Sequence, residues 1–515
     1  MNPTTQSQKR PGIADDSAAV RAQLSAGQSA FVWQRLIVDT ETPVSAALKL
    51  IEPGRGDFIL ESVEGGATRG RYSLIGLAPD LVFRANGDSA EINRGWATDR
   101  TAFEPLEGIG ALEALRALVA ECRAEVAPEL PPALACLVGY FAYETVGLTE
   151  RLPRAPDNGL GTPDMLFVRP TVVLVFDRLA DALHLVAPIW NEPGLDIDAA
   201  IAAASDRLDA TAARLAAPLP ASQRAPADLP EVTVTAALPE GRYAEMVLRA
   251  KDYIVAGDIF QVVLAQRFST PFTLPPIDLY RALRRINPSP FLYHLDLPGF
   301  ALTGSSPEIL VRVRDGEVTV RPIAGTRPRG KTATEDAANR DSLLSDPKER
   351  AEHLMLLDLG RNDVGRVARA GTVQVTDSYM VEFYSHVMHI VSNVVGRLAP
   401  GEDALDALFA GFPAGTVSGA PKVRACEIIA ELEPETRGPY AGGVGYFSPD
   451  GNMDSCIVLR TALVKDGMMH VQAGAGIVAD SDPAYEQREC EAKSGALLAA
   501  AREAVRIASE PRFGQ

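Results

Sequence analysis

The sequence predicts an α+β fold whose sheets are at least partly antiparallel. Short β-branched runs alternate with turn signals over residues 31–188. From about residue 243 to residue 509, apolar positions recur at helical spacing in some stretches and alternate in others, which indicates helices interspersed with strands. Asp-Gly pairs at 315–316, 450–451 and 466–467 separate neighbouring strands. Because a two-residue turn can join only antiparallel neighbours, these pairs argue against a doubly wound parallel sheet.

In chain order, the first half is expected to be rich in strands and poor in helices. The clearest predicted strands cover residues 31–38, 57–62, 81–85 and 171–176. One helix is expected near 112–126, and the Ala-rich stretch 195–216 predicts another. The Pro/Ala stretch 217–230 has almost no periodicity, so we expect a linker there and a boundary near residue 230.

The second half is expected to alternate amphipathic helices with strands. Its predicted helices cover residues 242–257, 277–286, 346–359, 403–410, 420–432 and 485–508.

Composition indicates a globular protein and argues against nucleic acid as a partner. Of the 515 residues, 46% are apolar and 23% charged, which is ordinary globular usage. Fifty Lys and Arg against 67 Asp and Glu leave a formal charge of −17 at pH 7, which repels a phosphate backbone. Five scattered cysteines do not form a disulfide framework or a zinc motif. Residues 1–28 lack a signal-peptide core, and no run reaches a membrane span, so we expect a disordered tail and a cytoplasmic protein.

Residues 325–332 match the nucleotide-binding pattern G-x-x-x-x-G-K-[ST], but three observations argue against a P-loop. The preceding strand, 317–322, alternates apolar and polar side chains, whereas a P-loop strand is buried on both faces. Pro328 lacks an N–H in a loop that would have to donate N–H groups to phosphate. Asp358, which could complete the pattern, lies in a stretch with helical periodicity.

Two predicted helices each carry a pair of glutamates three residues apart. Glu349 and Glu352 share one helix face, and Glu486 and Glu489 share another. One carboxylate from each helix, completed by water and a substrate carboxylate, would suit Mg²⁺. Such pairs taken alone are more often solvated surfaces. The glycine-rich segment 473–476 favours a ligand site because it leaves backbone amides bare.

Arg460 and His389 both lie in apolar surroundings. Arg460 lies in the run 456–464, which predicts a strand with apolar side chains on both faces. A buried guanidinium needs an anionic partner, and both an internal carboxylate and a substrate carboxylate remain open. His389, between Met388 and Ile390, is by itself as compatible with a core residue as with a catalytic one.

Together these segments resemble the chorismate-utilising enzymes, and among them the branch that makes anthranilate. The most specific stretches are 321–326 (RPIAGT), 348–353 (KERAEH) running on to 358–363 (DLGRND), 415–422 (GTVSGAPK) and 473–476 (AGAG). The resemblance covers nearly all of the chain beyond the tail. It implies a two-sheet, largely antiparallel sandwich flanked by helices. The segments are then a tail (1–28), a β-rich segment with a regulatory site (29–216), a linker (217–238) and a chorismate-binding catalytic segment (239–509).

The resemblance implies a metal site and a substrate pocket. Glu352 and Glu489 match the family's Mg²⁺ ligands, with Glu349 and Glu486 beside them. Arg460 is implied to hold the enolpyruvyl carboxylate of chorismate together with a tyrosine. The implied pocket comprises Gly325, Thr326, Thr416, Tyr440, Arg460, Gly474, Ala475, Gly476 and Lys493.

The resemblance also implies a catalytic set and separates related activities. Glu308 matches the general acid that protonates the departing C4 hydroxyl, His389 matches a histidine implicated in pyruvate elimination, and Thr326 lies with them. Isochorismate-forming relatives have a lysine base at the position of Gln261, and a neutral amide cannot activate water. Synthases of 4-amino-4-deoxychorismate commonly have a nucleophilic lysine at Ala324. Both positions favour addition of ammonia and formation of anthranilate and pyruvate, a step of tryptophan biosynthesis.

The resemblance further implies a partner and an inhibitor. No cysteine has the Gly-x-Cys-x-Gly surroundings of a glutaminase nucleophile, so a separate glutaminase subunit is expected to supply ammonia within a hetero-oligomer, a heterotetramer in our expectation. Ser62 and Pro290, Phe291 and Leu292 match a feedback pocket for L-tryptophan, although Tyr and Met are frequent at the last two positions. Contact between Ser62 and Pro290 would require the two halves of the chain to interleave.

Overall fold

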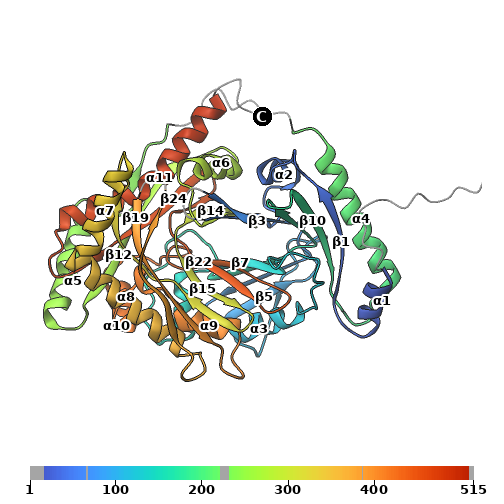
Figure 1. Cartoon of the computed structure of the whole chain (residues 1–515), viewed down its shortest axis with the longest axis horizontal. Helices are drawn as coiled ribbons and strands as arrows, with labels where there is room; N and C mark the ends of the chain where they lie inside the picture. The colour runs from blue at the N-terminus through green and yellow to red at the C-terminus, as the bar shows by residue number, and fades with distance from the viewer. Residues whose placement is uncertain (1–16, 65–67, 221–230, 385–386, 510–515) are drawn as a thin grey trace, which may run out of the picture.

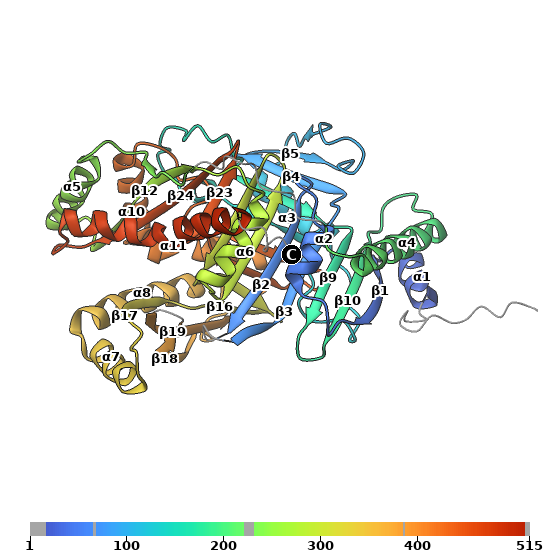
Figure 2. The same ribbon diagram turned by 90° about the horizontal axis from the view of Figure 1, so that it is seen from above.

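Two antiparallel sheets face each other, and each combines strands from both halves of the chain (Figure 1). The computed structural model describes residues 17–64, 68–220, 231–384 and 387–509. Every pairing between named strands is antiparallel, and helices flank the sheets (Figure 2). The predicted α+β, two-sheet fold is confirmed.

The first sheet brings the N-terminal strands beside the strands of the second half. In spatial order it consists of β1 (Ala30–Ile37), β10 (Ala182–Ile189), β9 (Val172–Asp177), β3 (Thr68–Leu77), β2 (Asp57–Glu64), β13 (Phe291–Leu297), β14 (Phe300–Ser306), β23 (Thr461–Lys465), β24 (Met468–Ile477), β12 (Gln261–Pro271) and β11 (Thr235–Ala236), with β20 (Gly419–Ala420) also on β12. The two halves meet where β2 pairs with β13.

The second sheet also combines strands from both halves of the chain. Its order is β17 (Ile323–Pro328), β19 (Val387–Arg397), β16 (Glu317–Val320), β15 (Ile309–Arg314), β22 (Met453–Ile457), β21 (Gly443–Phe447), β7 (Leu137–Phe141), β8 (Met165–Arg169), β4 (Leu81–Asn86), β5 (Ser89–Asn93) and β6 (Glu104–Pro105), with β18 (Gln374–Phe383) on β19. The halves join where β7 pairs with β21. The expected interleaving of the two halves is therefore confirmed by both sheets.

Helices cover the outer faces. They are α1 (Ser17–Ser25), α2 (Pro43–Leu50), α3 (Ala111–Glu121), α4 (Ile197–Ala216), α5 (Arg242–Ala256), α6 (Pro276–Ile286), α7 (Ala333–Ser345), α8 (Pro347–Gly365), α9 (Ala404–Gly411), α10 (Lys422–Leu432), α11 (Pro483–Ser509) and the 3₁₀ turns η1 (Tyr143–Leu148) and η2 (Gly415–Val417). None of the described helices is long and apolar enough to cross a membrane.

Three hydrophobic clusters hold these layers together. The largest fills the space between the sheets and includes Leu264 of β12 and Val138 of β7. The second lies under α2 and α4, and the third joins α6 and α11 to β24, where Leu497 of α11 is fully buried. Burial of apolar surface on both faces of the first sheet fixes its position relative to the helices.

The predicted turns and most predicted helices are present. Asp-Gly pairs join β15 to β16, β21 to β22 and β23 to β24. The antiparallel hairpin of β15 and β16 and the helical position of Asp358 in α8 support the rejection of a P-loop. Two helices, α2 and α7, were not expected: α2 is only eight residues long and α7 buries only Leu343, so neither shows a long apolar stripe.

Two expectations need correction. The segment predicted to be a disordered tail contains α1, because Val20 and Leu24 pack against the second hydrophobic cluster; residues 1–16 lie outside the described part. The run 456–464 is not one strand. It divides into β22 of the second sheet and β23 of the first, with Arg460 between them at a φ of +48°. The apolar pattern on both faces reflects two strands in different sheets, which the sequence period cannot reveal.

Candidate active site

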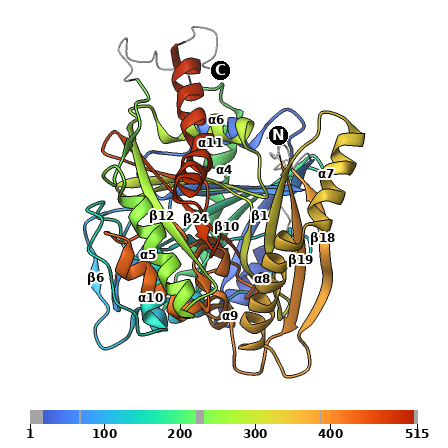
Figure 3. The ribbon, with the colours of Figure 1, turned by 90° about the vertical axis from the view of Figure 1, so that its left-hand side faces the viewer.

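Helices α8 and α11 carry the predicted acidic pairs; α8 packs against β17 and β19, and α11 packs against β24 (Figure 3). α8 begins at Pro347, which suits a first helical position. The side chain of Asp346 caps it by accepting the N–H groups of Lys348 and Glu349 at 2.9 and 3.3 Å. This start places Glu349 and Glu352 in the first two turns.

One carboxyl of each acidic pair has a raised pKa. Burial and then the neighbouring Glu349 carboxylate raise the pKa of Glu352. Burial and then the Glu489 carboxylate raise the pKa of Glu486. The charge of Lys493 lowers both values, so this ammonium lies within electrostatic reach of both helices. Like charges held this close favour a cation between them.

Lys493 already neutralises part of this charge. Its Nζ lies 2.7 Å from Oε1 of Glu489 and donates to the carbonyl oxygen of Gly474 at 2.9 Å. The ammonium therefore links α11 to β24. Among the described residues, no group of three or more His, Cys, Asp or Glu side chains is arranged to hold a metal ion by itself.

The glycines of β24 allow close approach to β12. Gly476 lies opposite Val263, and a Cβ on Gly476 would come within 2.4 Å of Nε2 of Gln261. A Cβ on Gly474 would come within 2.9 Å of both the hydroxyl of Tyr440 and the carbonyl oxygen of Leu264. The glycines are therefore required by packing, and they bring the amide of Gln261 to 3.4 Å from Oε1 of Glu352.

His389 lies on β19 beside the Gly325-Thr326 pair of β17. Its Nδ1 is 3.1 Å from the carbonyl oxygen of Gly325 and 3.1 Å from the hydroxyl of Thr326. Because a carbonyl only accepts, the proton lies on Nδ1 and the lone pair on Nε2. Burial lowers the pKa of His389 to about 4, so the ring is neutral near pH 7.

Gly325 connects this histidine to the acidic helix. Gly325 has a φ of +70°, and a Cβ there would come within 3.1 Å of Oε2 of Glu349. The other oxygen of Glu349 accepts a hydrogen bond from Arg327 at 2.9 Å. The predicted residues of β17, β19 and α8 are therefore in contact with one another and form one continuous group.

Glu308 is a buried carboxyl between β14 and β15. The hydroxyl of Thr416, in η2, donates to its Oε1 at 3.2 Å. Burial raises the pKa of Glu308 to about 8, so the group is mainly protonated at neutral pH. A neutral carboxylic acid at this position can donate a proton to a leaving group.

Arg460 is held where the chain passes from one sheet to the other. Its carbonyl oxygen accepts the N–H of Ser305 in β14 at 3.1 Å. No carboxylate of the described residues pairs with its guanidinium, and burial lowers its pKa. Its charge also lowers the pKa of His389, so the two side chains are close. A desolvated guanidinium without a protein anion is a site for a ligand carboxylate.

Tyr384 was not predicted and lies in the same group. Its ring contacts His389 edge-on with centroids 5.4 Å apart, and its hydroxyl donates to Glu382 at 2.9 Å. The charges of Glu308 and Arg460 both interact with it. Its sequence surroundings carry no motif, so only the fold shows that it lies beside His389.

The predicted inhibitor residues form a separate group. Ser62 on β2 lies directly opposite Phe291 on β13, and Leu292 lies opposite Glu61. Leu292 is buried, whereas Ser62, Pro290 and Phe291 are partly exposed. The fold therefore brings together the two segments that the resemblance implied.

A family model described as chorismate binding enzyme matches residues 58–499. A protein of Cereibacter sphaeroides named anthranilate synthase component 1 is 54% identical over 480 residues, which are 93% of this chain and 96% of the relative. A protein of Thermus thermophilus with the same name is 50% identical over 468 residues, covering 90% and 96%.

Solved structures agree. Anthranilate synthase component I from Streptococcus pneumoniae superimposes with a TM-score of 0.74 at 35% identity, covering 90% of this chain and 98% of that one. The menaquinone-specific isochorismate synthase from Escherichia coli superimposes with a TM-score of 0.70 at 19% identity, covering 94% and 98%. The latter similarity concerns the fold alone.

Proposed function

The chain belongs to the chorismate binding enzyme family, and from this premise we propose that it converts chorismate and ammonia into anthranilate, pyruvate and water. The relatives named anthranilate synthase component 1 support this activity over most of the chain's length. The enzyme is then a lyase of tryptophan biosynthesis.

The observation that carries the proposal is the guanidinium of Arg460. It is desolvated, has no carboxylate partner among the described residues, and lies near the neutral ring of His389. Chorismate is a dianion with two carboxylates, one of which would satisfy Arg460 in a bidentate manner. Arg460, Lys493 and a metal ion would then reverse, at the site, the negative charge of the whole protein.

Glu308 would act first. Ammonia forms a bond to C2 of the ring while the bond from C4 to its hydroxyl breaks, and the proton of Glu308 leaves with that hydroxyl as water. Thr416 orients the carboxyl through its hydrogen bond. The neutral amide of Gln261 cannot deprotonate water, so ammonia is the favoured nucleophile over the water that would give isochorismate.

His389 would act second. Its unprotonated Nε2 takes the proton from C2, and the bond between the ring carbon and the enolpyruvyl oxygen breaks, so the ring becomes aromatic. The released enolpyruvate takes up one proton at its methylene carbon, which balances the proton removed from C2, and becomes pyruvate. Thr326 and the carbonyl of Gly325 fix the orientation of the imidazole. Ala324, on the same strand, offers no nucleophile for the covalent route used in 4-amino-4-deoxychorismate synthesis.

The acidic residues of α8 and α11 fit a magnesium ion. Mg²⁺ usually takes one or two protein carboxylates and keeps several waters, which agrees with pairs of glutamates on two helices and with pKa values raised by like charge. Glu352 and Glu489 would hold the ion, with Glu349 and Glu486 beside them. When bound, the ion would neutralise and orient the ring carboxylate of the substrate.

Ammonia would come from a second subunit. All five cysteines are buried, and burial raises the pKa of Cys136, Cys426, Cys456 and Cys490, so these thiols are poor nucleophiles. A glutaminase component is the expected partner in the cytoplasm, and the relatives' designation as component 1 agrees with a second component. L-tryptophan would bind at Ser62, Pro290, Phe291 and Leu292.

The test uses the purified chain with chorismate, MgCl₂ and an ammonium salt at mildly alkaline pH. Anthranilate fluorescence should appear and should require both Mg²⁺ and ammonium. The variant Arg460→Gln should lose at least about tenfold in kcat/KM, whereas the exposed Arg397→Gln should match the wild type. Formation of isochorismate, or no product from folded protein, would contradict the proposal.

A further inference from the structure

One edge of β12 has a gap in its strand pairing. The gap lies in the stretch of β12 whose other edge pairs with Gly474 and Gly476 of β24. Among the described residues, β20 pairs with β12 at Gln261 and Val262, and β11 pairs with it from Phe268 onward. The residues between them, 263–267, pair on their other edge with residues 472–476 of β24. The backbone that supports the glycines therefore needs other hydrogen-bond partners along the gap.

A buried ion pair supplies partners in this gap. Glu433 accepts the N–H of Ala265 at 2.8 Å, and Arg437 donates to the carbonyl oxygen of Val263 at 2.7 Å. The guanidinium and carboxylate also bond to each other twice, at 2.9 and 2.6 Å. Their side chains are only 1% and 3% exposed. Val263 and Ala265 lie opposite Gly476 and Gly474, so the pair fixes the strand against which the glycines of β24 pack.

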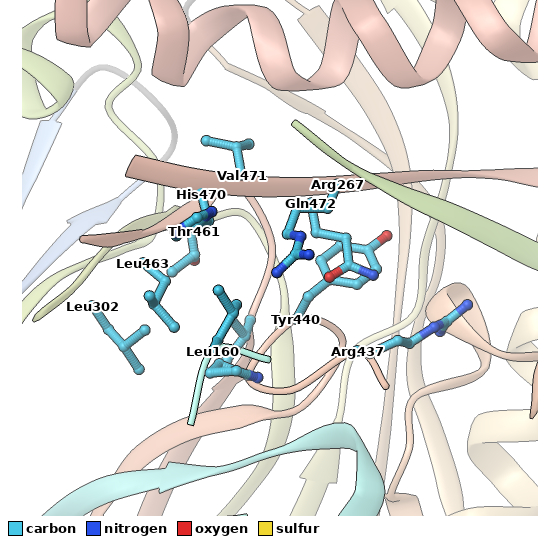
Figure 4. A pocket seen from close by; sticks show the side chains of 12 residues that line it. Leu160, Arg267, Leu302, Arg437, Tyr440, Thr461, Leu463, His470, Val471 and Gln472 are labelled. Atoms are coloured by element: carbon cyan, nitrogen blue, oxygen red, sulfur yellow. The ribbon is translucent and has the colours of Figure 1, made fainter. Parts of the chain in front are cut away.

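The same arginine reaches two further parts of the site. Its Nη1 donates to the carbonyl oxygen of Val417 at 2.7 Å, and Val417 directly follows Thr416 in η2. Tyr440 lies three residues after Arg437, and its ring centroid is 5.7 Å from the guanidinium carbon. Figure 4 shows the side chains of Arg437 and Tyr440 leaving one loop in different directions.

Glu144 holds the backbone of this loop from the other side. Its two carboxylate oxygens accept the N–H groups of Arg437 and Gly438 at 2.7 and 3.0 Å. The N–H of Tyr143 donates to the carbonyl oxygen of Gly438 at 2.9 Å. The loop that leads to Tyr440 is therefore fixed both at the Arg437 side chain and at its backbone.

We propose that Glu433 and Arg437 are positioning residues that hold Gly474 and Gly476, Thr416 and Tyr440 in one arrangement for binding chorismate. The inference rests on the proposed function and extends it to residues that do not touch substrate. The planar guanidinium serves Glu433, Val263 and Val417 at once, which a lysine ammonium cannot reproduce. Loss of this geometry shifts three parts of the substrate pocket together, and small displacements of binding groups are costly.

The test compares Arg437→Lys and Glu433→Gln with a matched control, Arg169→Lys. Arg169 is also buried and bonds to the Asp80 carboxylate at 2.8 and 2.9 Å, but it lies on β8 outside the site. For folded Arg437→Lys and Glu433→Gln we expect KM for chorismate to rise at least about tenfold, with a smaller fall in kcat. Calorimetry with chorismate and Mg²⁺ should show a matching loss of affinity. The control should lower Tm and leave both constants unchanged.

A further variant, Glu144→Gln, keeps the proposal testable if Arg437→Lys and Glu433→Gln do not fold. Glu144 borders a cavity of about 270 Å³, so Glu144→Gln leaves room for water to complete the hydrogen bonds of the loop. This variant should fold and raise KM about threefold, since it loosens only the backbone link. If Glu144→Gln and every folded variant of the pair bind chorismate like the wild type, the proposal is wrong. A wild type that makes no anthranilate but binds chorismate would contradict the proposed function instead, and the calorimetric comparison would still decide this inference.

Discussion

Glu308, as the proposed general acid, would set the upper pH limit of the reaction. Burial raises its pKa to about 8, and a general acid works only while protonated. We therefore expect kcat, measured at constant free ammonia, to be flat below about pH 8 and to fall nearly tenfold per unit above it. Stopped or continuous anthranilate fluorescence across pH 6.5–10 gives the profile. A kcat that stays flat to pH 10 would remove Glu308 from the role.

The same shift affects stability in a defined direction. The unfolded-state pKa of Glu308 is near 4.5 and the folded value about 8, so the folded state binds the extra proton and stability falls as pH rises from about 4.5 to 8. Glu308→Gln removes this penalty. At pH 9 it should raise the free energy of unfolding by on the order of 4 kcal/mol while kcat falls about 10²-fold or more. Thermal melts at pH 5 and pH 9 test this, since the stability difference from wild type should be small at pH 5 and large at pH 9.

The residues proposed to act on the substrate could be identified from the sequence, but the residues proposed to position them could not. Glu308, His389 and Arg460 lie in motifs or unusual apolar surroundings that the sequence displays. Arg437 bonds to backbone atoms of Val263 and Val417, far away in sequence. No pattern in one sequence shows which carbonyl a side chain will meet, so these positions emerge only from the fold.

At the scale of elements, α8 and α11 form the two sides of the proposed magnesium site. Glu352→Gln or Glu489→Gln should reduce activity at saturating Mg²⁺ by at least about 10²-fold, because each removes a charged ligand from a shell with few protein oxygens. Circular dichroism should be unchanged. Titration of activity with Mg²⁺ is the measurement.

Glu491→Gln is the matched control for this pair. Glu491 lies on α11 but is exposed and accepts a hydrogen bond from Gln487. It should keep the wild-type Mg²⁺ response. Wild-type turnover in Glu352→Gln or Glu489→Gln would place the metal elsewhere.

A second prediction concerns Ser62, on β2 where this strand pairs with β13, and the proposed tryptophan pocket. A Cβ on Gly70 would come within 1.8 Å of Oγ of Ser62, so there is little space on that side of the residue. A phenyl ring at position 62 must project into the proposed tryptophan pocket or displace the strand. Ser62→Phe should therefore raise the tryptophan concentration for half inhibition at least about tenfold, with uninhibited activity retained.

Inhibition curves for Ser62→Phe and for Ser89→Phe, an exposed residue of β5, provide the comparison. Only the first should lose sensitivity. Equal inhibition of both variants would move the inhibitor site away from β2.

Local sequence patterns predicted most helices, strands and turns. They failed where the conformation depends on contacts with residues far away in the sequence. The Asp-Gly turns were predictable because the turn type demands those residues. The break at Arg460 was not, since an arginine at a φ of +48° has no sequence signal and the apolar runs on both sides continue through it. α7 was missed because only one of its residues is buried, so no apolar stripe marks it.

For the molecule as a whole, the inferred contact between Ser62 and Pro290 predicted the arrangement of the two halves, which composition could not. The expected approach of Ser62 to Pro290 required the two halves to interleave, and both sheets do so. The register of the strands was beyond the sequence, because it depends on pairings across more than 200 residues.

The whole chain is expected to use ammonia and not glutamine. With chorismate, Mg²⁺ and glutamine, the purified chain should form no anthranilate and release no glutamate, because its thiols are buried. The same preparation with ammonium chloride should be active. Glutamate release by the chain alone would show a glutaminase centre that the buried cysteines do not explain.

Interleaving also has a consequence during synthesis. When the ribosome has made β7, its partner β21 is still about 300 residues away, which at 5–20 residues per second is roughly 15–60 s. During that time the edge of β7 is open to other strands, whereas the edge of β2 is open only until its partner β13 is made, about 230 residues after β2. The nascent first half therefore exposes strand edges that can aggregate, and both sheets are complete only when the last third of the chain has been made.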